Sequence, residues 1–331
     1  MTVSPDMVTI DDGGFLAGVT QQNLHLTELH QHLLDHLRRC APLAWRQAAQ
    51  SCPPAPDGRE TAEGCQAYHQ IWQYLRLLGI NTSIDSDSEF LLSVLRQLLR
   101  EHSLQDIHLS GAADFSLLAH VLWAGRLADR TPAIDLLDRC PTALWANDWY
   151  ATQQNRKVIL QLGDILAADQ YGAARFDLVA AHNLLVFFAP RQRSVILQHW
   201  YQWLKPGGYL VTVVTVRPDS CVAADEPQAM PAEQVQRIGA MTARARQDHE
   251  VDLSAAELVQ AALRFAGNAR VYHLSSAVDF LQTLTDHGFQ IRVAQCVPQS
   301  NPLRDCPAHT RQRLRIVARK PVTAEPGRSS P

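Results

Sequence analysis

The sequence of 331 residues lacks the segments that place a protein in or across a membrane. Its longest mainly apolar stretch, residues 176–189, is shorter than the roughly 20 residues that a spanning helix needs, and it contains His182 and Asn183. The first fifteen residues carry three aspartates and no basic residue, unlike a secretory signal. We therefore expect neither a membrane span nor a signal peptide.

The sequence also lacks a cysteine pattern. Its seven cysteines are an odd number, and no two of them form a C-x-x-C pair. Neither a disulfide framework nor a structural zinc site is favoured, so we predict no metal and a reducing, cytoplasmic location. His32 and His36 lie four residues apart on one predicted helix face, but without a third ligand a solvated face is favoured over a metal site.

No block of like charge is present. The 30 Lys and Arg residues nearly balance the 33 Asp and Glu residues, and the net charge is −3. Such a chain offers no electrostatic reason to bind nucleic acid or an anionic membrane, and we expect neither as a partner. Apolar residues make up 46% of the chain, as in ordinary globular proteins. The oligomeric state is left open.

The first hundred residues are predicted to be helical. Leucines recur at three- and four-residue steps over residues 22–50, and two further helices are expected, one over residues 67–78 and one that begins near Ser86 or Asp87. Either residue is a plausible N-cap. We assign residues 1–102 to an amino-terminal helical domain, and residues 321–331, which are nearly free of apolar side chains, to a disordered tail.

From Asp106 onward, short apolar runs alternate with helical stretches. Strands are predicted at residues 107–110, 133–137, 158–162, 176–180, 209–216, 289–297 and 313–317. Helices are predicted at residues 116–126, 142–155, 190–204 and 275–287, and residues 217–272 form a helical insertion. This alternation is typical of a parallel α/β sheet with helices on both faces, which binds ligands at the carboxyl ends of its strands. The second domain is assigned to residues 103–320.

Three acidic residues follow three of the predicted strands. Asp114 lies just after a tight stretch of small residues, Asp138 ends the second strand, and Asp164 follows Gly163 after the third. A carboxylate at the end of the second strand can accept hydrogen bonds from ribose hydroxyls. Each single aspartate could equally be a helix N-cap, whereas their order along the sheet favours a ligand site.

The later part of this pattern resembles the class I S-adenosylmethionine-dependent methyltransferases. The most specific match begins with Arg-Phe-Asp-Leu-Val at residues 175–179 and continues through Asn-Leu-Leu at 183–185. It ends with Leu-Lys-Pro-Gly-Gly-Tyr-Leu at residues 204–210, which is similar to the family's turn into the fifth strand. Residues 134–138, 163–165, 288–289 and 313–321 are similar to other core segments. The resemblance implies a Rossmann-like, seven-stranded sheet.

The resemblance also implies S-adenosylmethionine as the cofactor and assigns positions to it. Gly111 and its neighbours would contact the methionine part, Asp138 the ribose, and Asp164 with Ile165 the adenine. The full set of expected cofactor residues is Ser110, Gly111, Ala112, Asp114, Asp138, Arg139, Asp164, Ile165, Ala181, His182 and Asn183. His182 is the expected proton acceptor, or else it bonds a loop carbonyl; Asn183 holds a substrate group or satisfies the turn.

One departure from the family pattern lies in the first loop. Ser-Gly-Ala-Ala-Asp at residues 110–114 keeps one glycine where the family usually has three, and alanine can replace glycine wherever φ stays negative. Aromatic faces stabilise a sulfonium cation, and we expect one or two of seven to face the ligand: Tyr68, Trp72, Tyr74, Trp145, Trp149, Tyr150 and Tyr171. The helical domain and the insertion are expected to form a lid.

Three functions remain open at this point. The first is methyl transfer to a small molecule, which the absence of a basic stripe and the lid-sized additions favour. The second is cyclisation of the cofactor to azetidine-2-carboxylate with release of methylthioadenosine, as in azetidine-2-carboxylate synthases, which are methyltransferase-like. The third is a non-enzymatic scaffold, against which the presence of Asp138 and Asp164 argues.

Overall fold

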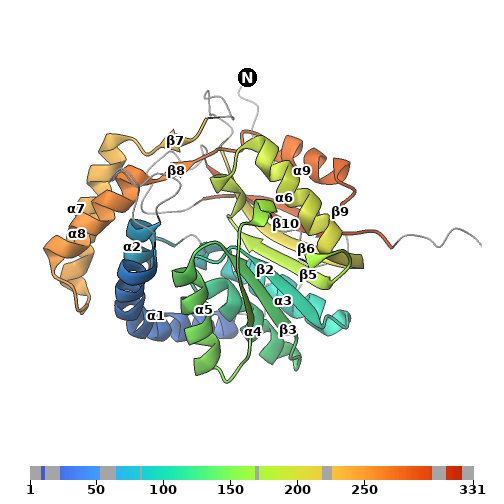
Figure 1. The fold of residues 1–331 in the computed structure, drawn as a ribbon, viewed down its shortest axis with the longest axis horizontal. Coiled ribbons are helices and arrows are strands. Elements are labelled where there is room, and N and C mark those ends of the chain that lie inside the picture. Colours follow the sequence, from blue (N-terminus) through green and yellow to red (C-terminus); the bar gives the residue numbers. More distant parts are fainter. Residues whose placement is uncertain are drawn as a thin grey trace, which may run out of the picture.

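The structure is a computed structural model that describes residues 9–11, 23–52, 65–82, 84–167, 171–217, 226–299 and 311–322. A central sheet carries helices on both faces, and further helices stand at one end of it (Figure 1). No helix in the described part of the chain is both long and apolar enough to cross a membrane. Residues 323–331, most of the predicted tail, lie outside the described residues.

Within the described residues the sheet has eight strands, in the order β1-β9-β10-β6-β5-β2-β3-β4. Their bounds are β1 Thr9–Asp11, β2 Asp106–Ser110, β3 Ala133–Asp138, β4 Ile159–Leu162, β5 Phe176–His182, β6 Leu204–Val216, β9 Gln290–Pro298 and β10 Gln312–Arg319. Strands β4, β3, β2, β5 and β6 run parallel, whereas β10 is antiparallel to both of its neighbours. The seven predicted strands are all present, and the predicted Rossmann-like α/β class is confirmed.

The eighth strand, β1, was not predicted. It pairs antiparallel with the edge strand β9 over three residues, from Thr9↔Gln295 to Asp11↔Val293. A three-residue strand has too few positions to display the alternation that identifies longer strands. It is recognised only by its pairing with β9 in the structure.

The central strands are buried on both faces, and alternate residues join two different cores. Leu178 and Ala180 of β5 belong to one core, and Val179 and Ala181 belong to the other. This follows from the two-residue period of a strand. The first core is covered by α3 (Ser88–Glu101), α4 (Ser116–Ala128) and α5 (Pro141–Gln153), and the second by α6 (Pro190–Trp203) and α9 (Ala277–Asp286).

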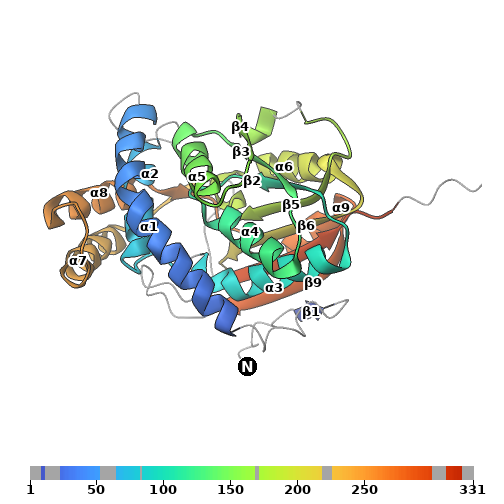
Figure 2. The same ribbon diagram turned by 90° about the horizontal axis from the view of Figure 1, so that it is seen from below.

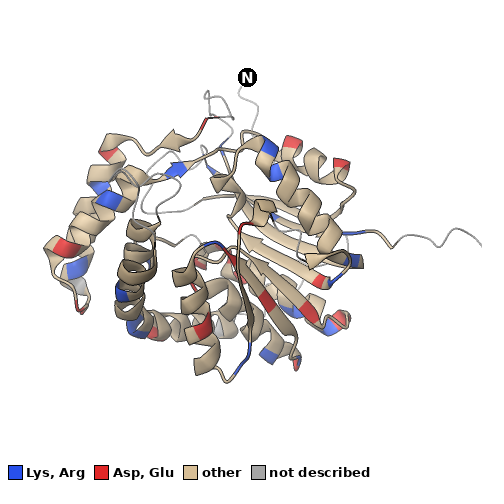
Figure 3. Cartoon of the chain, in the orientation of Figure 1, with Lys and Arg blue, Asp and Glu red and all other residues tan. Residues whose placement is uncertain are grey.

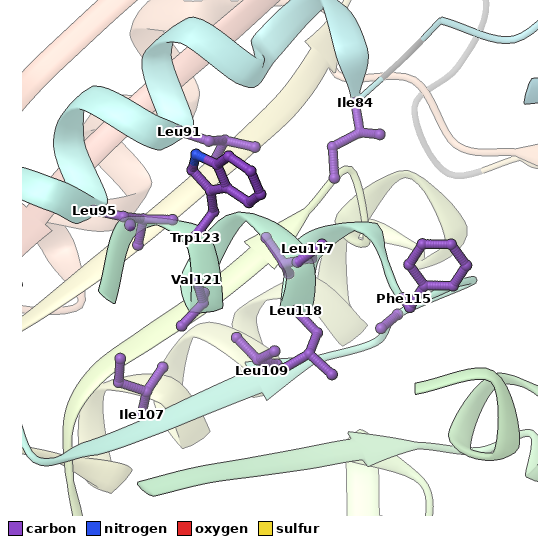
Figure 4. Packing of buried hydrophobic residues seen from close by; sticks show 14 of the residues in the cluster. Ile84, Leu91, Leu95, Ile107, Leu109, Phe115, Leu117, Leu118, Val121 and Trp123 are labelled. Atoms are coloured by element: carbon purple, nitrogen blue, oxygen red, sulfur yellow. The ribbon is translucent and has the colours of Figure 1, made fainter. Parts of the chain in front are cut away.

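Helix α4 shows how the first core is built. Its Leu118 and Val121 pack toward Ile107 and Leu109 of β2 (Figure 4). On its other side, the indole of Trp123 lies beside leucines of α3 (Figure 4). Apolar side chains three and four residues apart thus join the sheet and the outer helix.

A cap of four helices stands beside the carboxyl ends of the parallel strands (Figure 2). It comprises α1 (Asn23–Ser51), α2 (Gln66–Leu77), α7 (Ala232–Asp248) and α8 (Ala255–Asn268). These helices share a core of their own, which includes Ala41, Ile71, Leu75, Ile238 and Leu258. The insertion is not wholly helical as predicted, because β7 (Gln228–Ala229) pairs antiparallel with β8 (Arg270–Val271) and closes its two ends together.

The prediction that His32 and His36 of α1 lie on a solvated helix face is wrong. His36 is buried, and the Nε2 atom of His32 lies 2.9 Å from the Tyr150 hydroxyl. Both rings pack on aromatic residues of α5, because α1 crosses that helix.

Asp87 connects the helical part of the chain to the last strand. It precedes α3, but its side chain makes no capping hydrogen bond. Its fully buried carboxylate instead accepts hydrogen bonds from Arg313 Nη2 at 2.7 Å and Arg315 Nε at 2.8 Å, and lies 3.0 Å from His182 Nε2. Burial raises the pKa of Asp87, but the charges of Arg313 and Arg315 and the bond with His182 lower it well below its ordinary value.

We expect Asp87→Asn to lower the free energy of unfolding by about 3–5 kcal/mol, because the variant leaves buried guanidinium charge uncompensated. Urea denaturation at pH 7 measures the free energy of unfolding. Glu101→Gln, an exposed change at the end of α3, is the control and should change that free energy by less than about 0.5 kcal/mol. The folded-state pKa is depressed, so the stabilisation is complete above the unfolded pKa of about 3.9 and declines below it. A loss under 1 kcal/mol, or one that grows as the pH falls below about 4, would contradict this role.

Candidate cofactor-binding site

A cavity of about 380 Å³ opens at the carboxyl ends of β2, β3 and β5. Nine of the eleven residues expected to bind the cofactor line it: Gly111, Ala112, Asp114, Asp138, Arg139, Asp164, Ile165, His182 and Asn183. The other two do not. Ala181 lies in the core, and the Ser110 hydroxyl is buried and accepts a hydrogen bond from Trp200 Nε1 at 2.9 Å.

The first loop needs its one glycine. Gly111 has φ +65°, and a Cβ atom there would lie 2.5 Å from Cδ1 of Leu184. Ala112 and Ala113, the next two residues of the loop, do not have positive φ. The loop therefore keeps glycine at the one position where both the backbone and the neighbouring side chain require it.

Asp138 lies where a ribose-binding carboxylate is expected. Its Oδ2 accepts a hydrogen bond from the Ala112 N–H at 2.9 Å, and its Oδ1 accepts one from the Cys140 N–H at 2.8 Å. Each carboxylate oxygen can accept a second hydrogen bond, so two acceptor positions remain for hydroxyl groups. Burial raises the pKa of Asp138 above its ordinary value.

Asp114 is committed to the protein itself. Its carboxylate forms an ion pair with Arg76 Nη1 at 2.9 Å and accepts hydrogen bonds from Trp72 Nε1 and the Ser116 N–H. Burial raises the pKa of Asp114, but Arg76 lowers it below its usual value, so the carboxylate is ionised. Arg76 in turn reaches Asp85 at 2.7 Å. This network fixes the first loop to α2.

Asp164 lines the cavity and also caps a short helix. Its Oδ1 accepts a hydrogen bond from the Leu166 N–H at 2.9 Å at the start of η3 (Ile165–Ala167). The N-cap reading of this aspartate therefore holds in the structure, while its exposed carboxylate faces a cavity that Ile165 also lines.

His182 is the last residue of β5, and Asn183 follows it; both line the cavity. The Nε2 of His182 lies 3.0 Å from Asp87 Oδ2 and 2.8 Å from Arg313 Nη2, so its partner is not a loop carbonyl. Burial, and next the charge of Arg313, lower its pKa despite the bond with Asp87. Asn183 has φ +53°, and its Oδ1 accepts hydrogen bonds from the Thr215 N–H and hydroxyl. The carboxamide oxygen therefore positions the turn.

Aromatic rings form the wall opposite the strand ends. Of the seven aromatics proposed from the sequence, Tyr68 and Trp72 of α2 line the cavity. Their rings stack at 4.7 Å, and Phe265 of α8 lies 5.6 Å from Tyr68. Phe187 of η5 (Leu185–Phe187) contacts Tyr68 edge-on.

Sequence reasoning missed Phe187 and Phe265. Phe187 follows His182 and Asn183 closely, which was a usable signal. Phe265 reaches the cavity only because α8 packs against α2, a tertiary contact that no local pattern announces.

Known proteins were compared with the chain. A family model described as "Methyltransferase domain" matches residues 121–212, from the middle of α4 to β6. The search of curated proteins found no significant match. The similar solved structures include the N-methyltransferase NodS from Bradyrhizobium japonicum WM9 in complex with S-adenosyl-L-homocysteine, at 17% identity over 74% of this chain and 90% of that chain, with a TM-score of 0.45.

Two further structures have comparable scores. An O-methyltransferase family protein from Burkholderia thailandensis is 14% identical over 78% of this chain and 61% of that chain, with a TM-score of 0.47. An S-adenosylmethionine-dependent methyltransferase from Methanosarcina mazei is 14% identical over 68% of this chain and 96% of that chain, with a TM-score of 0.43.

We expect Gly111→Ala to destabilise the protein more than Gly172→Ala. Both glycines have φ near +65°, so each change carries about 1–2 kcal/mol of backbone strain, but a Cβ at residue 172 meets nothing within 4 Å. The clash with Leu184 adds about 1–3 kcal/mol. Urea denaturation of the two variants measures the difference, and Leu184→Ala in the Gly111→Ala background should recover part of it. Equal losses in the two single variants would show that Leu184 moves aside without cost.

Proposed function

We propose that this chain, in which residues 121–212 match a family model described as "Methyltransferase domain", is a class I S-adenosylmethionine-dependent enzyme that transfers a methyl group from S-adenosylmethionine to a small molecule. One observation carries the proposal. The cavity extends from the loops expected to hold the cofactor to a wall of aromatic side chains from α2, η5 and α8. Such a continuous space supports a second, partly apolar molecule beside the cofactor.

The residues present fit this cofactor. The paired oxygens of Asp138 keep two acceptor positions, which suits the two hydroxyls of a ribose. Gly111 lines the cavity beside Asp138, and the space that its Cβ would take is filled by the side chain of Leu184. When bound, S-adenosylmethionine supplies a methyl group activated on a positively charged sulfur. The faces of Tyr68 and Trp72 attract a cation of that kind by roughly 0.5–2 kcal/mol each.

His182 is the side chain proposed to accept a proton from the methyl acceptor. Its lowered pKa keeps the imidazole neutral near pH 7, as a base must be. Arg313 Nη2 has Asp87 Oδ2 as its own acceptor at 2.7 Å, so His182 can donate from Nε2 to the same carboxylate. In that tautomer the lone pair lies on Nδ1, and Asp87 orients the ring and stabilises its protonated form.

The proposal is tested by incubating purified protein with S-adenosylmethionine, first alone and then with a panel of small amine, hydroxyl and thiol acceptors. Mass spectrometry should find the cofactor intact in the first case, and S-adenosylhomocysteine with a methylated acceptor in the second. If the protein instead forms methylthioadenosine and azetidine-2-carboxylate from the cofactor alone, faster than in its absence, the reaction is cyclisation of the cofactor and not methyl transfer.

With an acceptor in hand, His182→Ala should lower kcat by about 10²–10⁴-fold and change cofactor affinity little, because a general base acts in the transition state. His249→Ala, an exposed histidine at the end of α7, is the matched control. If kcat/KM and the cofactor Kd change together, His182 positions the loop and is not the base.

Asp138→Ala should weaken S-adenosylmethionine binding by roughly 1.5–3 kcal/mol, the value of hydrogen bonds to a charged group. Isothermal titration calorimetry measures the Kd, and Asp148→Ala, an exposed aspartate on the neighbouring helix α5, should leave it unchanged. Unaltered affinity in a folded Asp138→Ala protein would remove this carboxylate from the site.

A further inference from the structure

Four metal-ligating side chains converge at the edge of the cavity, and we call them the Cys3His cluster. Its members are Cys52, Cys65, His69 and Cys140. Cys65, His69 and Cys140 line the cavity, whereas Cys52 lies behind them and is buried. None of the four has a role in the binding or the chemistry proposed above.

Three separate segments bring the cluster together. Cys52 directly follows α1, and its N–H bonds back to the carbonyl of Ala48. Cys65 immediately precedes α2, and His69 follows one helical turn later on the same face, because residues four apart are neighbours on a helix. Cys140 precedes α5. The cluster therefore spans two helices of the cap and the loop after β3.

The donor atoms are spaced as the corners of a small polyhedron. Cys140 Sγ lies 3.5 Å from Cys52 Sγ, 3.4 Å from Cys65 Sγ and 3.3 Å from His69 Nδ1. His69 Nδ1 lies 3.6 Å from Cys52 Sγ, and all four donor atoms lie within 4.8 Å of one another. A tetrahedron with metal–sulfur bonds of about 2.3 Å and a metal–nitrogen bond of about 2.0 Å has edges of about 3.5–3.8 Å.

From this geometry we propose that the Cys3His cluster binds one Zn²⁺ ion. Three thiolates and one imidazole are a donor set that zinc prefers, and four protein ligands complete its tetrahedral coordination. No position then remains for a substrate, so the ion is structural. When zinc binds, each cysteine thiol that is still protonated releases its proton to solvent, and His69 presents the lone pair of Nδ1 to the metal. In the metal-free protein that nitrogen can instead donate to the carbonyl of Cys65, at 3.1 Å.

One further contact suits a metal centre. The hydroxyl of Thr142 lies 3.1 Å from Cys52 Sγ, where it can donate to a thiolate. Such outer hydrogen bonds commonly orient metal ligands. A disulfide is the competing fate of two neighbouring thiols, but it would use two of the three cysteines and leave the third beside the histidine.

The position of the ion gives it a consequence for the cavity. The N–H of Cys140 donates to Asp138 Oδ1 at 2.8 Å, so a metal held by Cys140 fixes one of the donors that orient the expected ribose acceptor. The same ion holds the start of α2, which carries Tyr68 and Trp72, against the loop after β3. Zinc would thus join the polar and the aromatic walls of the cavity.

The test uses the full chain, expressed with zinc in the medium and purified in a reducing, chelator-free buffer. Inductively coupled plasma mass spectrometry should find one zinc ion per chain. Zinc K-edge X-ray absorption on the wild-type protein should give three sulfur neighbours at about 2.3 Å and one nitrogen at about 2.0 Å. This second measurement needs no variant, so it stands even where a substitution prevents folding.

Variants assign the ligands. Cys65→Ser and His69→Ala should each lose most of the bound zinc, whereas Cys40→Ser and Cys296→Ser, at buried cysteines outside the cluster, should keep it. A folded wild-type chain without zinc after dialysis against the ion would overturn the proposal. So would a disulfide between two cluster cysteines in protein kept under reducing conditions, or full zinc content in both ligand variants. Neither measurement uses turnover, so failure of the methyl-transfer proposal would leave this result unaffected.

Discussion

The buried carboxylate of Asp87 is the contact on which the arrangement of the cavity depends. It belongs to the helical part of the chain, yet its partners Arg313 and Arg315 lie on the last strand, and His182 lies at the end of β5. A charge placed inside a protein loses several kcal/mol of hydration, which only closely placed opposite charges offset. The helical layer can therefore dock on the sheet in one geometry only. Arg313 also reaches Thr215, which holds Asn183, so one carboxylate fixes three residues at the strand ends.

The ion pair between Arg76 and Asp114 works in the same manner at the first loop. Arg76 comes from α2 and Asp114 from the loop after β2, and both side chains are buried. The loop that faces the expected methionine part is consequently held by the cap and not by the sheet alone. Because charges of both signs are scattered over the ribbon (Figure 3), these buried pairs, and not a surface field, carry the electrostatic specificity of the fold.

The strands of the sheet could be predicted from the sequence, because the core strands are continuous apolar runs and the turns between elements have typical residues. The match of residues 204–210 located the first half of β6, which begins at Leu204 and not after the predicted turn, and the aspartates after the strands located the cavity. The long-range contacts of the helical part of the chain could not be predicted from the sequence. Asp87 has the sequence context of an N-cap. No local pattern indicates that its two arginine partners lie more than two hundred residues later in the chain. Cys52, Cys65 and Cys140 have no regular spacing, so their convergence follows from the docking of α1 and α2 alone.

The cavity therefore has two walls of different origin. The strand ends supply the polar wall with Asp138, whose position follows from the parallel sheet. The cap supplies the aromatic wall with Tyr68 and Phe265, and its position follows from buried contacts between α2, α8 and the sheet. Movement of α2 relative to the loop after β3 would change both walls at once, because Cys65 and Cys140 meet at their boundary. A zinc ion in the proposed Cys3His site would cross-link the two walls at that boundary.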